Sequence, residues 1–176
     1  MVIRRKGASA RVEDVVHQAS AARGTFYIYF ETWDDLLLAM RERVFEHLDR
    51  RFSAWVDSAN DWESLVLGLP KLFVDMTLEL EGLHQAVLHG PISGTPPGQT
   101  RHDVIQRLTD FINDGVAAGA FVVANPRETA RLAFAVLHET ADQVERGAPR
   151  ETTITAAQDM LIRSLKPATT ARQLEQ

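Results

Sequence analysis

Apolar residues recur along this chain at intervals of three or four positions, the period of helices that are buried along one face. Leu36, Leu37, Met40, Val44, Leu48 and Phe52 mark one such stripe. Alternation with a period of two is nearly absent, so the pattern predicts an all-α protein. We expect helices at about residues 12–19, 23–30, 33–56, 61–80, 82–89, 100–118, 126–144 and 151–165.

Local signals support several of these helix ends. Asn125 and Pro126 combine a capping side chain with proline at the first helical position, which is a strong helix start. Asp61 is a further candidate cap, for the helix expected at 61–80. Gly119 is expected to end the helix at 100–118. Pro70 falls inside the helix expected at 61–80, so we predict a bend or break near Gly68.

The first two expected helices are short and are joined by a turn of about four residues. Such a pair is typical of a helix-turn-helix, whose second helix can enter the major groove of DNA. Phe26 and Phe30 lie four residues apart as core anchors, which leaves Tyr27, Ile28 and Tyr29 to face elsewhere. Hydroxyl groups can donate to phosphate oxygens, and an apolar side chain can contact a thymine methyl group. An ordinary helical hairpin, whose aromatic residues pack against the protein, is the alternative.

The segment Arg-Gly-Thr-Phe-Tyr-Ile-Tyr-Phe at 23–30 closely resembles the recognition helix of TetR-family transcriptional regulators. The resemblance implies a helix-turn-helix head at 1–35 and a helical ligand-binding and dimerisation body at 36–176. It implies a ligand-responsive repressor that binds a pseudo-palindromic, double-stranded DNA operator as a homodimer. Thr25, Tyr27 and Tyr29 are expected to contact phosphates, and Arg23 and Ile28 to lie near bases. The implied DNA-binding set is Arg11, Arg23, Gly24, Thr25, Tyr27, Ile28 and Tyr29.

Charge is distributed in agreement with a DNA-binding head. Residues 1–30 carry five basic and two acidic side chains, a net charge of +3, whereas the remaining residues carry 14 basic and 22 acidic side chains, a net charge of −8. A positive region on an acidic protein attracts phosphates. The same charges also suit an ordinary solvated surface, so they add modest support.

The head departs from the family pattern in four ways. Ser20 replaces a usual turn glycine, Ala22 a usual capping serine, and Trp33 a common phosphate-binding lysine. The family also places a full helix before this motif, where only residues 1–6 precede Gly7. We therefore expect an incomplete first helix and a mobile or poorly packed segment at 1–30. The alternative function is a helical, small-molecule-binding dimer that lost DNA binding through truncation of the head.

The resemblance also guides the body. Its middle helices are expected to enclose a pocket for an unknown small apolar effector, because apolar bulk there accompanies one titratable group. The candidate pocket residues are Phe73, Met76, Leu80, His84, Leu88 and Phe111. In TetR-like proteins the last two helices meet their symmetry mates. The candidate dimer residues, small beside large on one face, are Ala133, Leu137, Ala141, Ile154, Ala157 and Leu161; ordinary core helices are the alternative.

Other classes of function find little support in the sequence. There is no cysteine, phosphate-binding glycine loop or nucleophile elbow. Glu81 and His84 have the spacing of a di-iron ligand pair, but a di-iron bundle needs a second such pair, which is missing. We therefore expect no enzyme activity, metal or cofactor. No apolar run spans a membrane and no signal peptide is present, which predicts a cytoplasmic protein.

Overall fold

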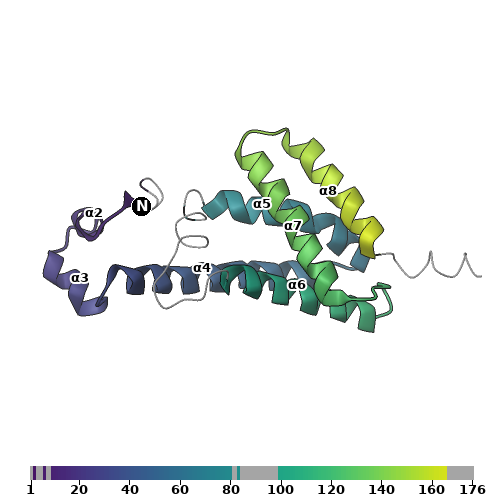
Figure 1. The fold of residues 1–176 in the computed structure, drawn as a ribbon, viewed down its shortest axis with the longest axis horizontal. Coiled ribbons are helices and arrows are strands. Elements are labelled where there is room, and N and C mark those ends of the chain that lie inside the picture. The colour runs from purple at the N-terminus through teal and green to yellow at the C-terminus, as the bar shows by residue number, and fades with distance from the viewer. Residues whose placement is uncertain (1, 3–5, 7–8, 81–82, 84–98, 166–176) are drawn as a thin grey trace, which may run out of the picture. The chain divides into compact units, whose positions relative to one another are not determined.

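The computed structural model describes residues 2, 6, 9–80, 83 and 99–165. Seven helices lie within these residues, and no strand does (Figure 1). The all-α prediction is confirmed, and the bounds of these seven helices agree with the expected ones to within two residues. The helices are α2 (Val12–Gln18), α3 (Arg23–Tyr29), α4 (Trp33–Ser58), α5 (Trp62–Leu80), α6 (Gln99–Ala117), α7 (Pro126–Glu145) and α8 (Arg150–Leu165). The helix expected at 82–89 lies outside the described residues.

Side-chain caps explain where three helices begin. Asn125 Oδ1 accepts from the backbone N–H of Glu128 at 3.2 Å at the start of α7, as the sequence predicts. Asp61 Oδ1 accepts from the N–H of Ser64 at 2.7 Å ahead of α5. Before α4, the side chains of Thr32 and Asp35 each accept from the other's N–H, at 3.1 and 2.7 Å, forming a capping box. These bonds satisfy amides that have no partner inside their helix.

The chain forms two compact units, 1–51 with 79–100 and 52–78 with 101–176. The division passes through α4, and the functional boundary between head and body at residue 35 stays a prediction. In the first unit, α4 supplies most of an apolar cluster in which Leu37 is buried. Val2, Ala10, Leu80 and Leu83 are the other buried members. The N-terminal residues Val2 and Ala10 are thus packed with the start of α4.

The second unit has a larger core, rich in aromatic rings. Phe52, Trp62 and Phe121 surround Phe111 with ring-centroid distances of 5.5–6.0 Å. Gly115 of α6 lies directly beneath Phe121, because a Cβ atom there would approach that ring to 2.2 Å. The glycine therefore lets the residues after α6 fold back onto this core.

Pro70 does not break α5. The sequence predicts a bend or a break near Gly68, and the break does not occur. The helix runs unbroken through Pro70, whose side chain is fully buried. Proline removes one backbone donor and crowds the preceding turn. Gln158 Nε2 of α8 donates to the carbonyl of Leu67 in that turn at 2.6 Å. A donor 91 residues away thus bonds a backbone carbonyl in the turn that precedes the proline.

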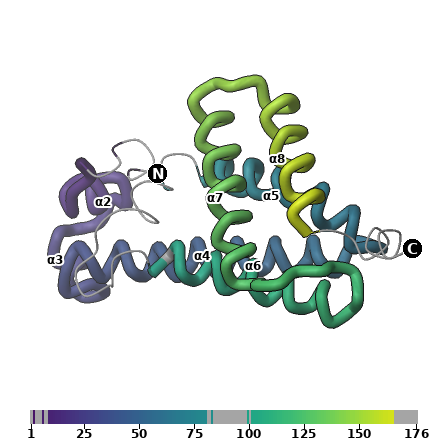
Figure 2. The backbone as a smooth tube through the Cα atoms, turned by 45° about the vertical axis from the view of Figure 1, so that its right-hand side comes forward, coloured from purple at the N-terminus to yellow at the C-terminus, as the bar shows by residue number. Residues whose placement is uncertain are grey.

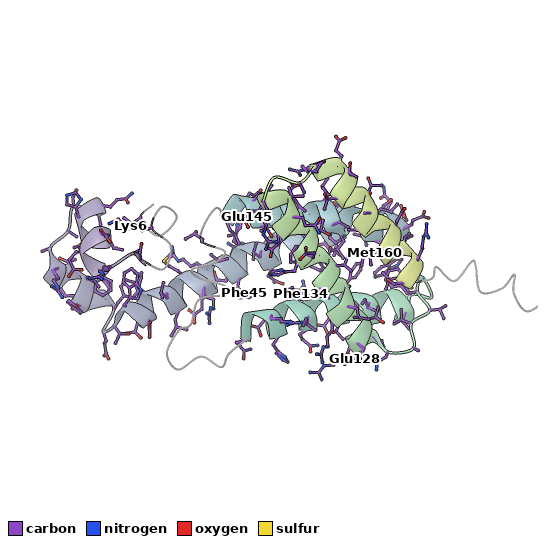
Figure 3. All side chains as sticks on the ribbon, turned by 45° about the horizontal axis from the view of Figure 1, so that its top comes forward. Lys6, Phe45, Glu128, Phe134, Glu145 and Met160 are labelled. Carbon is purple, nitrogen blue, oxygen red and sulfur yellow. The ribbon has the colours of Figure 1, made fainter. Side chains whose placement is uncertain are left out.

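Helices α7 and α8 pack side by side within the second unit (Figure 2). Each of the six candidate dimer residues is buried in the chain's own core, which leaves its side chain little surface for a second copy. Leu132 of α7 and Met160 of α8, the latter labelled in Figure 3, are exposed instead. Among the described residues, no helix is long and apolar enough to cross a membrane.

Candidate nucleic-acid interface

Helices α2 and α3 contact each other across a tight turn at 19–22. The N–H of Ala21 donates to the carbonyl of Val16 at 2.9 Å, which draws the chain back over the end of α2. Ser20 has a φ of 52°, in the left-handed region that favours glycine. Ser20 therefore occupies, at the position where the family usually has a turn glycine, a backbone conformation that is strained for serine.

Helix α3 separates its aromatic residues between two sides. Phe26 is buried, with its ring 5.2 Å from that of Tyr27 and 5.5 Å from that of Phe30. Tyr27, Ile28 and Tyr29 remain 47%, 78% and 75% exposed. The division of inward and outward positions is as the sequence predicts. Because these three residues are consecutive, they spread over about 200° of the 7-residue helix and leave only the Phe26 side anchored.

Arg23 opens α3 and is held by two acceptors of the head itself. Its Nη1 lies 3.0 Å from Glu13 Oε1 of α2, and its Nη2 donates to the hydroxyl of Tyr27 at 3.5 Å. The guanidinium carbon also lies 5.9 Å from the centre of the Tyr27 ring. The hydrogen bond to Tyr27, together with the charge of Glu13, raises the pKa of Arg23 above its ordinary value.

A groove of about 410 Å³ lies where α2, α3 and α4 begin. It has two guanidinium groups, one carboxylate and an indole in its lining; the residues are Ser9, Ala10, Arg11, Val12, Glu13, Arg23 and Trp33. Beside it, Asp14 accepts from Lys6 Nζ at 2.5 Å and from the N–H of Arg11 at 3.0 Å (Lys6 is labelled in Figure 3). The Lys6 ammonium and this N–H lower the pKa of Asp14.

The structure thus gathers the residues that the resemblance implies on and beside α3. Arg11, Gly24 and Thr25 are exposed, as are the outward residues of α3. No atom lies within 4 Å of the position that a Cβ atom would take at Gly24. The pairing of Arg23 with Glu13 was not expected from the sequence. The two lie ten positions apart on different helices, so no helical spacing signals their contact.

Several contacts that would strengthen the head are absent from its described residues, whereas Val2, Ala10 and Phe26 are buried. Ala22 caps α3 without a side-chain hydrogen bond. No residue of α2 is buried, and Val12, Val15 and Val16 are half-buried. Trp33, at the position of the expected lysine, packs against the apolar cluster of the first unit.

The candidate pocket residues fall in different parts of the chain. Leu80 belongs to the apolar cluster of the first unit, whereas Phe111 is in the core of the second. Phe73 of the second unit is half-buried and meets Phe134 edge-to-face at 6.2 Å. Met76 is half-buried in the same unit, and His84 and Leu88 lie outside the described residues.

Metal-ligating side chains do not gather in the part of the chain that the structure describes. No group of three histidine, cysteine, aspartate or glutamate residues there is arranged to hold an ion. His138 of α7 instead lies against the ring of Phe134 at 5.5 Å, with its Nδ1 3.6 Å from Asp142. This histidine has the contacts of a residue within a packed helix face.

Several solved protein structures resemble the fold of this chain over nearly its whole length. A TetR-family transcriptional regulator from Pectobacterium atrosepticum matches with 24% identity, covering 94% of this chain and 90% of that one, at a TM-score of 0.70. This chain has the TetR-family fold. The regulator FadR from Bacillus subtilis, solved with stearoyl-CoA, shares 15% identity over 93% of each chain at a TM-score of 0.74. A protein of unknown function from Rhodococcus sp. RHA1 shares 21% identity, covering 93% of this chain and 88% of that one, at a TM-score of 0.75. No protein-family model and no curated protein matches the sequence.

Proposed function

We propose that this TetR-like chain is a DNA-binding transcriptional regulator, and that it acts as a ligand-responsive repressor. The observation that carries the proposal is the exposed face of α3. Ile28 and Tyr29 are more than 70% exposed, and such apolar surface on a short helix is unfavourable without a partner. Phenol and threonine hydroxyls suit phosphate oxygens, and Ile28 suits a thymine methyl group.

The proposal divides the head residues between two roles. Thr25, Tyr27 and Tyr29 bind phosphates, with Arg11 as a further contact to the DNA backbone. Arg23 and Ile28 lie nearer the bases, and Gly24 lets the backbone approach the duplex. Phosphate contacts position a protein on DNA, whereas contacts to base edges determine which sequence it binds.

We further propose a homodimer formed through α7 and α8. The exposed side chains of Leu132 and Met160 support this surface, because large apolar residues are more stable when covered. Two heads then address two half-sites of a pseudo-palindrome. Replacing Leu132 or Met160 with aspartate is expected to weaken self-association, which sedimentation measures; an unchanged dimer places the interface elsewhere.

A small apolar effector completes the proposed regulator. Its support is the similarity to FadR, which was solved with stearoyl-CoA, and the half-buried aromatic contact of Phe73 with Phe134 in the second unit. The effector shifts the population of DNA-binding conformations only if it binds one of them more tightly. The proposed regulator needs neither catalysis nor a cofactor, in keeping with neighbours that are named as regulators.

The experiment compares variants by fluorescence anisotropy on several duplexes. Tyr27→Phe and Thr25→Ala are expected to weaken binding to every duplex alike, because phosphates are the same in each. Ile28→Ala is expected to change the order of preference among duplexes instead. Ser58→Ala, which removes an exposed hydroxyl at the end of α4 and outside both proposed surfaces, is the control and leaves both properties unchanged. Equal loss of preference from both groups of variants contradicts the division of roles.

One alternative has structural support of its own. The strained Ser20, the uncapped α3 and the half-buried valines of α2 favour a helical, small-molecule-binding dimer without DNA binding. Duplex affinity at several salt concentrations separates the two functions. A DNA-binding regulator loses affinity steeply as salt rises, whereas the alternative shows no affinity at any salt concentration.

A further inference from the structure

Two acidic side chains lie among the basic residues of the head, and their structural roles differ. Asp14 serves the fold, because it accepts from the N–H of Arg11 at the start of α2 and pairs with Lys6. Glu13 is 58% exposed and pairs across the turn with Arg23. A carboxylate beside the DNA-facing helix repels phosphates and competes with them for a guanidinium.

The geometry around Arg23 shows what DNA must displace. One terminal nitrogen faces Glu13 and the other donates to Tyr27, so both ends of the guanidinium have partners inside the protein. The hydroxyl of Tyr27 accepts from Arg23 and therefore keeps its own proton for donation to an outside acceptor. Only the Glu13 contact is a charge pair, and it is the one that an acceptor on DNA replaces.

We propose that Glu13 is a built-in competitor for Arg23, which lowers the affinity of the head for every duplex. This inference rests on the proposed DNA-binding function. Any duplex offers phosphates to the guanidinium, but each must displace a carboxylate that is already 3.0 Å away. A preferred sequence must displace the same carboxylate and remains the tighter-bound duplex through its additional base contacts. Glu13 thus acts through Arg23 to set the overall strength of DNA binding.

The test begins with Glu13→Gln, which removes the charge and keeps the size of the side chain. The variant is expected to bind duplexes of unrelated sequence several-fold more tightly than the wild type. Its plot of log affinity against log salt is expected to steepen by about 0.9, the value for one further neutralised phosphate. Glu31→Gln is the matched control, with the same charge change at an exposed position just after α3.

A second background shows whether Glu13 acts through Arg23. With Arg23→Ala present, Glu13→Gln is expected to raise affinity no more than Glu31→Gln does, because only the general field of the charge remains. A measurement without DNA adds a direct readout: exchange of the Arg23 Nη hydrogens is expected to be faster in Glu13→Gln than in the wild type, because Glu13 contacts Nη1.

The outcomes separate this inference from the proposed function. If the wild type binds duplexes but Glu13→Gln binds no more tightly than Glu31→Gln, the competitor role is refuted and DNA binding stands. Weaker binding by Glu13→Gln also refutes it, because the carboxylate then positions Arg23 for DNA. If no duplex is bound by the wild type or the variants, the proposed function fails and the inference falls with it.

Discussion

Two residues at the turn of the head are expected to limit its stability, and both can be improved. Ser20 has a φ of 52°, and the left-handed conformation costs a residue other than glycine about 1–2 kcal/mol. Glycine relieves this strain but adds roughly 0.4–1 kcal/mol of conformational entropy to the unfolded chain. Ser20→Gly is therefore expected to stabilise the head by about 0.5–1 kcal/mol.

Ala22→Ser adds a cap to α3. Ala22 precedes the helix in an extended conformation and makes no side-chain cap, and a serine at such a position contributes about 1 kcal/mol. Together the two changes are expected to stabilise the head by about 1.5–2 kcal/mol. Amide exchange of residues whose N–H groups close the turn, such as Ala21, is expected to slow by roughly 10- to 30-fold.

Matched controls place the same residue types where the reasoning predicts no gain. Ala19 has a φ of −79°, so Ala19→Gly is expected to speed amide exchange by adding entropy to the unfolded chain. Ala21→Ser places the hydroxyl one residue before the cap position and is expected to leave exchange near the wild-type rate. The reasoning is refuted if Ser20→Gly behaves like Ala19→Gly, or if Ala22→Ser protects no better than Ala21→Ser.

Three further changes test the second unit. Gln158→Ala removes the donor to the Leu67 carbonyl and is expected to lower the unfolding free energy in urea by about 1 kcal/mol; no loss refutes its role beside the proline. Gly115→Ala forces a methyl group into the Phe121 ring and is expected to cost about 1–3 kcal/mol in the same assay, whereas a neutral result contradicts the close contact. Burial raises the pKa of Asp75, but hydrogen bonds from its two basic partners outweigh this and hold the pKa below its ordinary 3.8. The ionised Asp75 therefore stabilises the fold above pH 3.8, and this stabilisation is lost as the pH falls below that value. The difference in unfolding free energy between the wild type and Asp75→Asn is expected to shrink below pH 3.8. A difference that stays constant with pH contradicts the prediction.

Local features of the sequence predicted most of the helices because their causes are local. Asn125 and Asp61 act on amides three residues away, so their caps are visible in the sequence. The unbroken course of α5 through Pro70 was not predictable in this way. The donor to the Leu67 carbonyl, in the turn before the proline, is Gln158, which comes from another helix far along the chain.

The site was predictable to a similar extent. Helical spacing placed Phe26 inside and Tyr29 outside, because a short helix with one anchored face leaves little choice. The stripe of Ala133 and Leu137 indicated a packed face, but spacing alone does not tell whether the packing partner is the same chain or a second copy. The structure packs that face within the chain itself.

DNA binding by the head is tested most directly by selecting duplexes from a random-sequence pool with the purified chain and footprinting the enriched ones. A pseudo-palindrome is expected, with half-sites centred about 10 base pairs apart or a multiple of that distance, as two recognition helices of a dimer require. Ile28→Ala is expected to change the enriched sequence, and Tyr27→Phe to lower its yield without changing it. The proposed function is contradicted if the folded chain enriches no sequence and protects no duplex from cleavage at low salt.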